Sequence, residues 1–255
     1  MKDFFNGKEW TDFIEKCRDR VKLDNKEFGI YSVFLPNPNI CPNPECHNPR
    51  YCLIAMEPKD DKNRLRELEN DLDGYQNFIE GYKELILHYC AYHHLGEKGF
   101  NYYITDISKG SMTMADAERS REKRWFEWRE LLKEEINLLR NGNDITIIPI
   151  GKDVQDFVEE LWSKNHKVRV ADYILHHSRR NLGSIYDNPY CEKIDEEELK
   201  VFVDLFVKHL NYYKRKDDVD NVLVEKKGVT QVSKFYAYYR HKFQSIKHQT
   251  TENKQ

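Results

Sequence analysis

Short apolar runs alternate along the chain with longer segments in which apolar residues recur every three or four positions. The runs have the length of buried strands, and the recurring pattern is typical of amphipathic helices. Strand-like runs occupy residues 51–55, 100–109, 145–150 and 173–176. Helical patterns separate them in units long enough for right-handed crossovers. The sequence therefore predicts an α/β fold with three α/β/α layers around a central, mostly parallel four-stranded sheet.

Further helical patterns place extra helices at both ends of this core. An apolar stripe runs through residues 10–21, where Thr11 is the expected N-cap. Additional helices are predicted over residues 65–89, 114–140, 154–162 and 195–213, the last opening with a capping-box spacing from Asp195 to Glu198. We expect one domain over residues 1–255, with a core at about 28–190 and a helical C-terminal extension at about 195–250.

The end of the first predicted strand carries a carboxylate. Residues 51–55 are apolar or aromatic, and Glu57 and Pro58 follow. Proline has no N–H for a ladder, so the sheet should end there. Ligands of open α/β sheets bind at the carboxyl ends of the strands. Glu57 is thus either an ordinary turn residue or part of a site.

Polar residues also follow the other predicted strands. The second strand ends in a run that contains Asp106 and Lys109, and Gly151 closes the third strand. The fourth runs into His176 and then into Ser178, Arg179, Arg180 and Asn181. Because parallel strands end at one edge of the sheet, we expect these residues to gather there.

Composition and charge exclude several classes of protein. The chain has 255 residues and a net charge of −3, so only the local distribution of charge can indicate a nucleic-acid partner. No apolar run reaches the ~18 residues of a membrane span, and the first residues lack the apolar stretch of a signal peptide. Six cysteines do not make a disulfide scaffold at this length. We expect a cytoplasmic monomer that contacts no membrane.

A loop rich in proline and asparagine, residues 34–50, carries Cys41, Cys46 and His47. A zinc or iron–sulfur site is one interpretation, but the spacing fits no closed four-ligand pattern. The alternative is a loop that shapes the mouth of a site. We expect no required cofactor, with a metal at Cys41 and Cys46 left open. Nucleotide cofactors are not expected either, since the glycine-rich phosphate loops are missing.

Two segments concentrate basic residues. Arg119, Arg121, Lys123, Arg124 and Arg129 alternate with glutamates in the helix at 114–140, a pattern typical of a solvated helix face. Residues 226–250 hold six Lys or Arg, no Asp or Glu, and five interleaved aromatic residues. That tail is either a nucleic-acid surface or an amphipathic helix packed on the main domain.

In order, the strand ends Ala55-Met-Glu-Pro58, Tyr103-Ile-Thr-Asp106, Ile148-Pro-Ile-Gly151 and His176-His-Ser-Arg-Arg-Asn181 resemble those of the uracil-DNA glycosylase superfamily. Its members carry an acidic residue near a proline after the first core strand. They also carry an Asn after a Tyr-Ile-Thr-type strand and a His-Pro-Ser-type loop near the end. The resemblance covers about residues 50–185.

The resemblance implies a monofunctional DNA glycosylase that leaves an abasic site. It implies that Glu57 positions or activates the attacking water and that His176 stabilises the departing base. Ser178, Arg179, Arg180 and Asn181 would fall on the loop that grips DNA. A carboxylate suits the positive charge that builds on the sugar, and a histidine suits the negative charge on the base. The base must first leave the stack.

Two departures from the family pattern bear on the base. Asp106 stands where uracil-specific members have Asn; an ionised Asp only accepts hydrogen bonds, which suits the N4 amine of cytosine. Lys59 follows the proline where those members often have a tyrosine that blocks C5. Together they favour a C5-modified cytosine, for example a glucosylated one in bacteriophage DNA. Antiviral defence is the corresponding biological role.

Two other functions remain open. The same fold could bind nucleic acid through its basic loop and tail without cutting it. Alternatively, the protein could process free nucleosides, as a deoxyribosyl transferase does, with Glu57 as a nucleophile.

Overall fold

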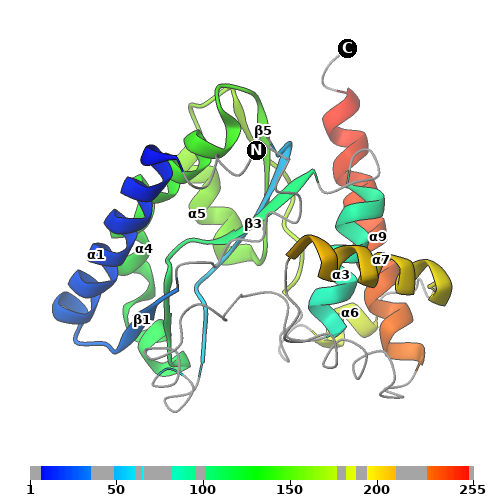
Figure 1. Cartoon of the computed structure of the whole chain (residues 1–255), viewed down its shortest axis with the longest axis horizontal. Coiled ribbons are helices and arrows are strands. Elements are labelled where there is room, and N and C mark those ends of the chain that lie inside the picture. Colours follow the sequence, from blue (N-terminus) through cyan, green and yellow to red (C-terminus); the bar gives the residue numbers. More distant parts are fainter. Residues whose placement is uncertain are drawn as a thin grey trace.

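A parallel sheet lies at the centre of the molecule (Figure 1). The computed structural model describes residues 7–35, 49–60, 65, 82–95, 101–176, 182–187, 194–210 and 229–252. Its main sheet contains β2 (Tyr51–Ala55), β3 (Tyr102–Asp106), β5 (Ile145–Pro149) and β6 (Val168–Val170) in the order β3-β2-β5-β6. All three pairings are parallel.

The strands β2, β3 and β5 are buried along their whole length, which explains their nearly continuous apolar runs. Successive residues of β2 face opposite sides. Cys52 and Ile54 enter a core shared with α1, α4 and α5, whereas Leu53 and Ala55 enter a second core on the other face. The sheet is therefore the middle layer of three.

One outer layer consists of α1 (Lys8–Phe28), α4 (Met114–Arg140) and α5 (Lys152–Trp162). The N-cap of α1 is Gly7 rather than the predicted Thr11, and its C-cap is Gly29 with φ 59°. The helix α4 has the predicted limits, and the hydroxyl of its N-cap Thr113 accepts from the Asp116 N–H. Its tryptophans Trp125 and Trp128 pack in the core with α1 and α5.

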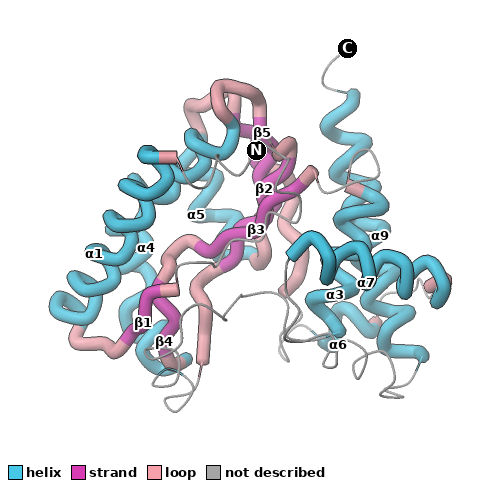
Figure 2. The backbone as a smooth tube through the Cα atoms, viewed as in Figure 1, coloured by secondary structure: helices cyan, strands magenta, loops and turns pink. Residues whose placement is uncertain are grey.

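The other outer layer consists of α3 (Tyr82–His94), α6 (Leu182–Tyr186), α7 (Glu196–Leu210) and α9 (Val229–Glu252), which cluster together in Figure 2. The Asp195 carboxylate caps α7 as predicted, because it accepts from the N–H groups of Glu197 and Glu198. The five aromatic residues of α9 are buried in the second core: Phe235, Tyr236, Tyr238, Tyr239 and Phe243. Of the two interpretations of this tail, the structure supports the packed amphipathic helix.

Two short strands, β1 (Ser32–Phe34) and β4 (Gly110–Met112), form a separate antiparallel pair that the sequence did not predict. Gly110 allows their close approach. A Cβ at this position would lie 3.1 Å from Ser32 Oγ and 3.3 Å from Val21 Cγ2.

The α/β class and the three layers are as predicted, but one strand was misplaced. The predicted fourth strand at 173–176 is not a strand. The strand beside β5 is β6, and Ile174 makes a single bridge to Ile150. The second strand ends at Asp106 instead of Lys109. In the described part of the chain, every helix is too short or too polar to cross a membrane.

Candidate functional site

Three strand ends meet at one edge of the sheet. Asp106 is level with Ala55 in the parallel register, and the Ile107 N–H donates to the carbonyls of Ala55 and Met56. On the other side of β2, the Ile150 N–H donates to the Ile54 carbonyl at 2.7 Å. If the four strands are numbered by their order along the chain, their order across the sheet is 2-1-3-4. Successive strands are therefore added on opposite sides of β2, and the switch point lies between β2 and β5. Ligands of doubly wound sheets bind at that position.

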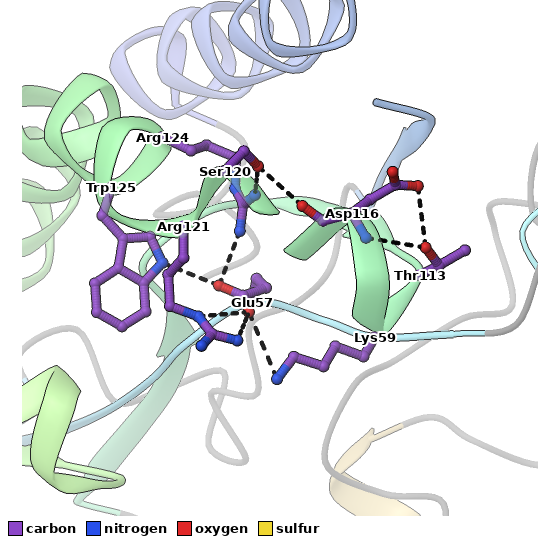
Figure 3. A network of polar contacts seen from close by, with 8 residues as sticks. All are labelled: Glu57, Lys59, Thr113, Asp116, Ser120, Arg121, Arg124 and Trp125. Atoms are coloured by element: carbon purple, nitrogen blue, oxygen red, sulfur yellow. Dashed lines mark hydrogen bonds and ion pairs between the residues drawn. The ribbon is translucent and has the colours of Figure 1, made fainter. Parts of the chain in front are cut away.

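Glu57 leaves the end of β2 and turns toward α4, as Figure 3 shows. Glu57 is only 6% exposed to solvent. Its Oε2 accepts from Arg124 at 3.0 Å and from the Trp125 indole at 2.9 Å. Its Oε1 accepts from two nitrogens of Arg121, at 3.1 and 3.3 Å, and lies 3.6 Å from Lys59 Nζ. Both carboxylate oxygens are thus engaged.

The cations around Glu57 keep it ionised. Burial alone would raise its pKa, but Arg124, Arg121, Lys59 and the Trp125 hydrogen bond together lower the pKa below the ordinary glutamate value. A carboxylate with a lowered pKa is a weak general base. In this arrangement Glu57 provides a fixed negative charge, and a water molecule could reach Oε1 only if Arg121 or Lys59 moved.

The two oxygens differ in the partners that hold them. The partners of Oε2 are buried, since the Arg124 side chain has no exposed surface and Trp125 packs in the core. The partners of Oε1 reach solvent, because the side chains of Arg121 and Lys59 are 19% and 30% exposed. Oε2 is therefore fixed, and Oε1 is held by side chains that can move.

The prediction of a solvated basic face on α4 was wrong for Arg124, which is buried, and holds only in part for Arg121, whose side chain is 19% exposed. Arg124 precedes Trp128 by four residues, so it lies on the buried stripe of the helix. That spacing was the available signal in the sequence. Arg124 also donates to the Ser120 hydroxyl at 2.5 Å. The structure makes α4 the main source of partners for Glu57.

Asp106 is buried at the end of β3, beside a second network of polar groups that the sequence did not reveal. Lys109 Nζ donates to the Asp106 carbonyl and pairs with Glu135 Oε2 at 2.7 Å. Glu135 Oε1 accepts from the hydroxyls of Tyr103 and Thr105, each at 2.9 Å. This buried pair fixes the backbone that carries Asp106.

His176 is partly buried and follows Ile174 by two residues, beyond the bridge to Ile150. The helix α9 fixes the preceding residue. The Leu175 N–H donates to the Tyr238 hydroxyl at 2.7 Å, and the Tyr239 hydroxyl donates to the Leu175 carbonyl at 3.3 Å. The C-terminal tail thereby positions the segment that enters the site.

Several predicted residues lie outside the described ranges: Ser178, Arg179, Arg180, Asn181, Cys41, Cys46 and His47. Cys52 is a buried free thiol in β2, and so are Cys17 and Cys90 in their helices. Among the described side chains, no three His, Cys, Asp or Glu residues are grouped so as to hold a metal ion.

The fold and the edge define a doubly wound α/β protein with a polar site at the carboxyl ends of its strands. A scan against models of known protein families gives no match, and a search of curated protein sequences gives none either.

Proposed function

We propose that the protein is a DNA glycosylase that hydrolyses the N-glycosidic bond of a flipped-out base and leaves an abasic site. The observation that supports the proposal is the chain position of three residues at the edge where such sheets bind ligands: Glu57 and Asp106 end neighbouring parallel strands, and His176 follows the bridge from Ile174 to Ile150. These are the positions that the resemblance to the uracil-DNA glycosylase superfamily assigns to catalysis and base recognition.

Each residue has a role in this proposal. Glu57 supplies the negative charge that stabilises the positive sugar, and it orients a water once one of its oxygens is released. His176 donates to the departing base. Asp106 accepts from the exocyclic amine of a cytosine-type base, and Lys59 leaves the C5 side open to a substituent. The substrate is a C5-modified cytosine, for example a glucosylated one in bacteriophage DNA. The enzyme acts without a cofactor.

A panel of oligonucleotides tests the proposal. Duplex and single-stranded DNA would each carry one uracil, cytosine, 5-hydroxymethylcytosine, glucosylated 5-hydroxymethylcytosine or hypoxanthine, and alkaline cleavage would reveal abasic sites. We expect cleavage at a modified cytosine, and its loss in His176→Ala. Cleavage at uracil alone would retain the activity and refute the role given to Asp106. Equal base preference in Asp106→Asn would refute it too.

Nucleic-acid binding without cleavage is a second candidate, and the engagement of both Glu57 oxygens by cations favours it. In a protein that only binds nucleic acid, Glu57 would hold the arginine side chains of α4 in position instead of activating water. Binding to the oligonucleotides with no base released from any of them would select this candidate.

A further inference from the structure

The surroundings of Glu57 hold more positive than negative charge. Lys59, Arg121 and Arg124 provide three positive charges against the single carboxylate, which leaves a net charge of +2 in this group of four side chains. The adjacent Arg20 forms a separate group with its own carboxylate partners Asp24, Glu27 and Glu127. A net positive group at the ligand-binding edge of a parallel sheet favours an anionic ligand.

Only two of these cations are suited to meet a ligand. Arg124 is buried and held by Glu57 and Ser120. Arg121 and Lys59 are partly exposed, come from separate segments, and converge on Oε1 (Figure 3). A guanidinium can bind two phosphate oxygens at once, and an ammonium adds a point charge beside it.

We propose that Arg121 and Lys59 bind a backbone phosphate of the DNA and in doing so release Glu57 Oε1. In the free protein both cations contact this oxygen. In the complex they turn to the phosphate, while Arg124 and Trp125 continue to hold Oε2. The cations then keep a negative partner in both states, and Oε1 becomes available to a water molecule only when DNA is present.

This inference deepens the proposed function, but its first part can be tested without catalysis. Fluorescence anisotropy with a labelled 20-base-pair duplex would give Kd between 50 and 200 mM KCl for wild type, Arg121→Gln and Lys59→Gln. Each lost phosphate contact reduces the slope of log K against log salt by about 0.9 on duplex DNA. We expect that reduction in each variant, and about twice as much in the double variant.

A matched control lies on the same helix. Arg140, at the far end of α4, is about 28 Å from Arg121 along the helix axis at 1.5 Å per residue. Arg140→Gln removes one positive charge, as Arg121→Gln does, but should leave the slope of log K against log salt unchanged. Arg121→Lys keeps the charge and should largely keep the wild-type slope. Equal slopes in wild type and Arg121→Gln would overturn the proposal. So would a reduction in Arg140→Gln as large as in Arg121→Gln, or an absence of wild-type binding at 50 mM KCl.

Single-turnover base release at saturating DNA tests the release of Oε1. If Arg121 blocks this oxygen, Arg121→Gln should bind more weakly yet release base at least as fast as wild type. A rate at least tenfold lower in bound Arg121→Gln, with its fold intact by circular dichroism, would refute the release step. If wild type released no base, the proposed glycosylase activity would be refuted, whereas the salt dependence of binding would still test whether Arg121 and Lys59 bind a phosphate.

Discussion

Replacing Glu57 with glutamine should destabilise the protein strongly, whatever the protein does. The amide has one acceptor and one donor, whereas both carboxylate oxygens now face donors. Whichever way the amide turns, one set of donors loses its acceptor. Arg124 is fully buried and would keep its charge without a carboxylate partner at this position.

The magnitude follows mainly from the buried half of the network. Removing one partner of a buried ion pair costs about 3–5 kcal/mol. Arg121 and Lys59 can turn toward solvent, so their loss should add no more than about 1 kcal/mol. We therefore expect Glu57→Gln to lower the free energy of unfolding by about 3–5 kcal/mol in urea titrations followed by circular dichroism.

The double variant Glu57→Gln/Arg124→Met provides the control. It removes the uncompensated charge, so its stability should exceed that of Glu57→Gln alone. A loss below about 1 kcal/mol in Glu57→Gln would refute the interpretation of a buried, fully paired carboxylate.

The same network makes the stability of the folded protein depend on pH. The pKa of Glu57 is lowered in the folded protein, so its stabilisation is present above the ordinary glutamate pKa and is lost as pH falls through the folded value. Asp24, which faces Arg124 from α1, acts in the opposite direction because burial raises its pKa. Wild type should lose stability below about pH 4 more steeply than Glu57→Gln.

Three further predictions concern the frame of the site. Burial and the neighbouring Arg240, His93 and Lys247 lower the pKa of His94 to about 4, while Glu198 opposes this shift. The free energy of unfolding of wild type should therefore decrease as pH falls from 6.5 to 4, and that of His94→Gln should decrease less, as measured by urea titrations across this pH range. Lys109→Met should cost about 3–5 kcal/mol by leaving Glu135 buried without its ammonium, and Lys109→Met/Glu135→Gln should recover part of that loss. Tyr238→Phe should cost about 1–3 kcal/mol because the Leu175 N–H loses its acceptor, and base release should slow as the His176 segment shifts; unchanged stability and rate would contradict this.

The sequence was sufficient for β2, β3 and β5 because each is a short apolar run buried on both faces. It was insufficient for β6, which has three residues with Arg169 at the centre and is therefore a weaker strand signal than the run at 173–176. The pair of β1 and β4 was missed for a similar reason, since each has only three residues.

The candidate site was predictable where it depends on strand ends and not where it depends on helix packing. Glu57 and Asp106 follow from the position of a carboxylate after a buried run. Their partners do not, because Arg124 is 67 residues from Glu57 and Glu135 lies on a helix whose charges alternate in sign. Such a pattern looks the same whether an arginine faces water or a buried carboxylate.

The proposed catalytic role of Glu57 and its structural role cannot be separated by substitution of this residue. Its Oε2 links β2 to α4 through buried partners, so any change that removes the charge also weakens the packing of that helix. Loss of base release in a Glu57 variant would thus follow from either catalysis or structure. Arg121 shares less of this ambiguity, because Oε1 is the Glu57 oxygen that it contacts and its side chain is partly exposed, although its guanidinium also lies over the Trp125 ring, 5.9 Å from the centroid. Removing Arg121 keeps the hydrogen bonds from Arg124 and Trp125 to Oε2, so a rate at least tenfold lower in bound Arg121→Gln would count against the release step rather than against the structural role of Glu57.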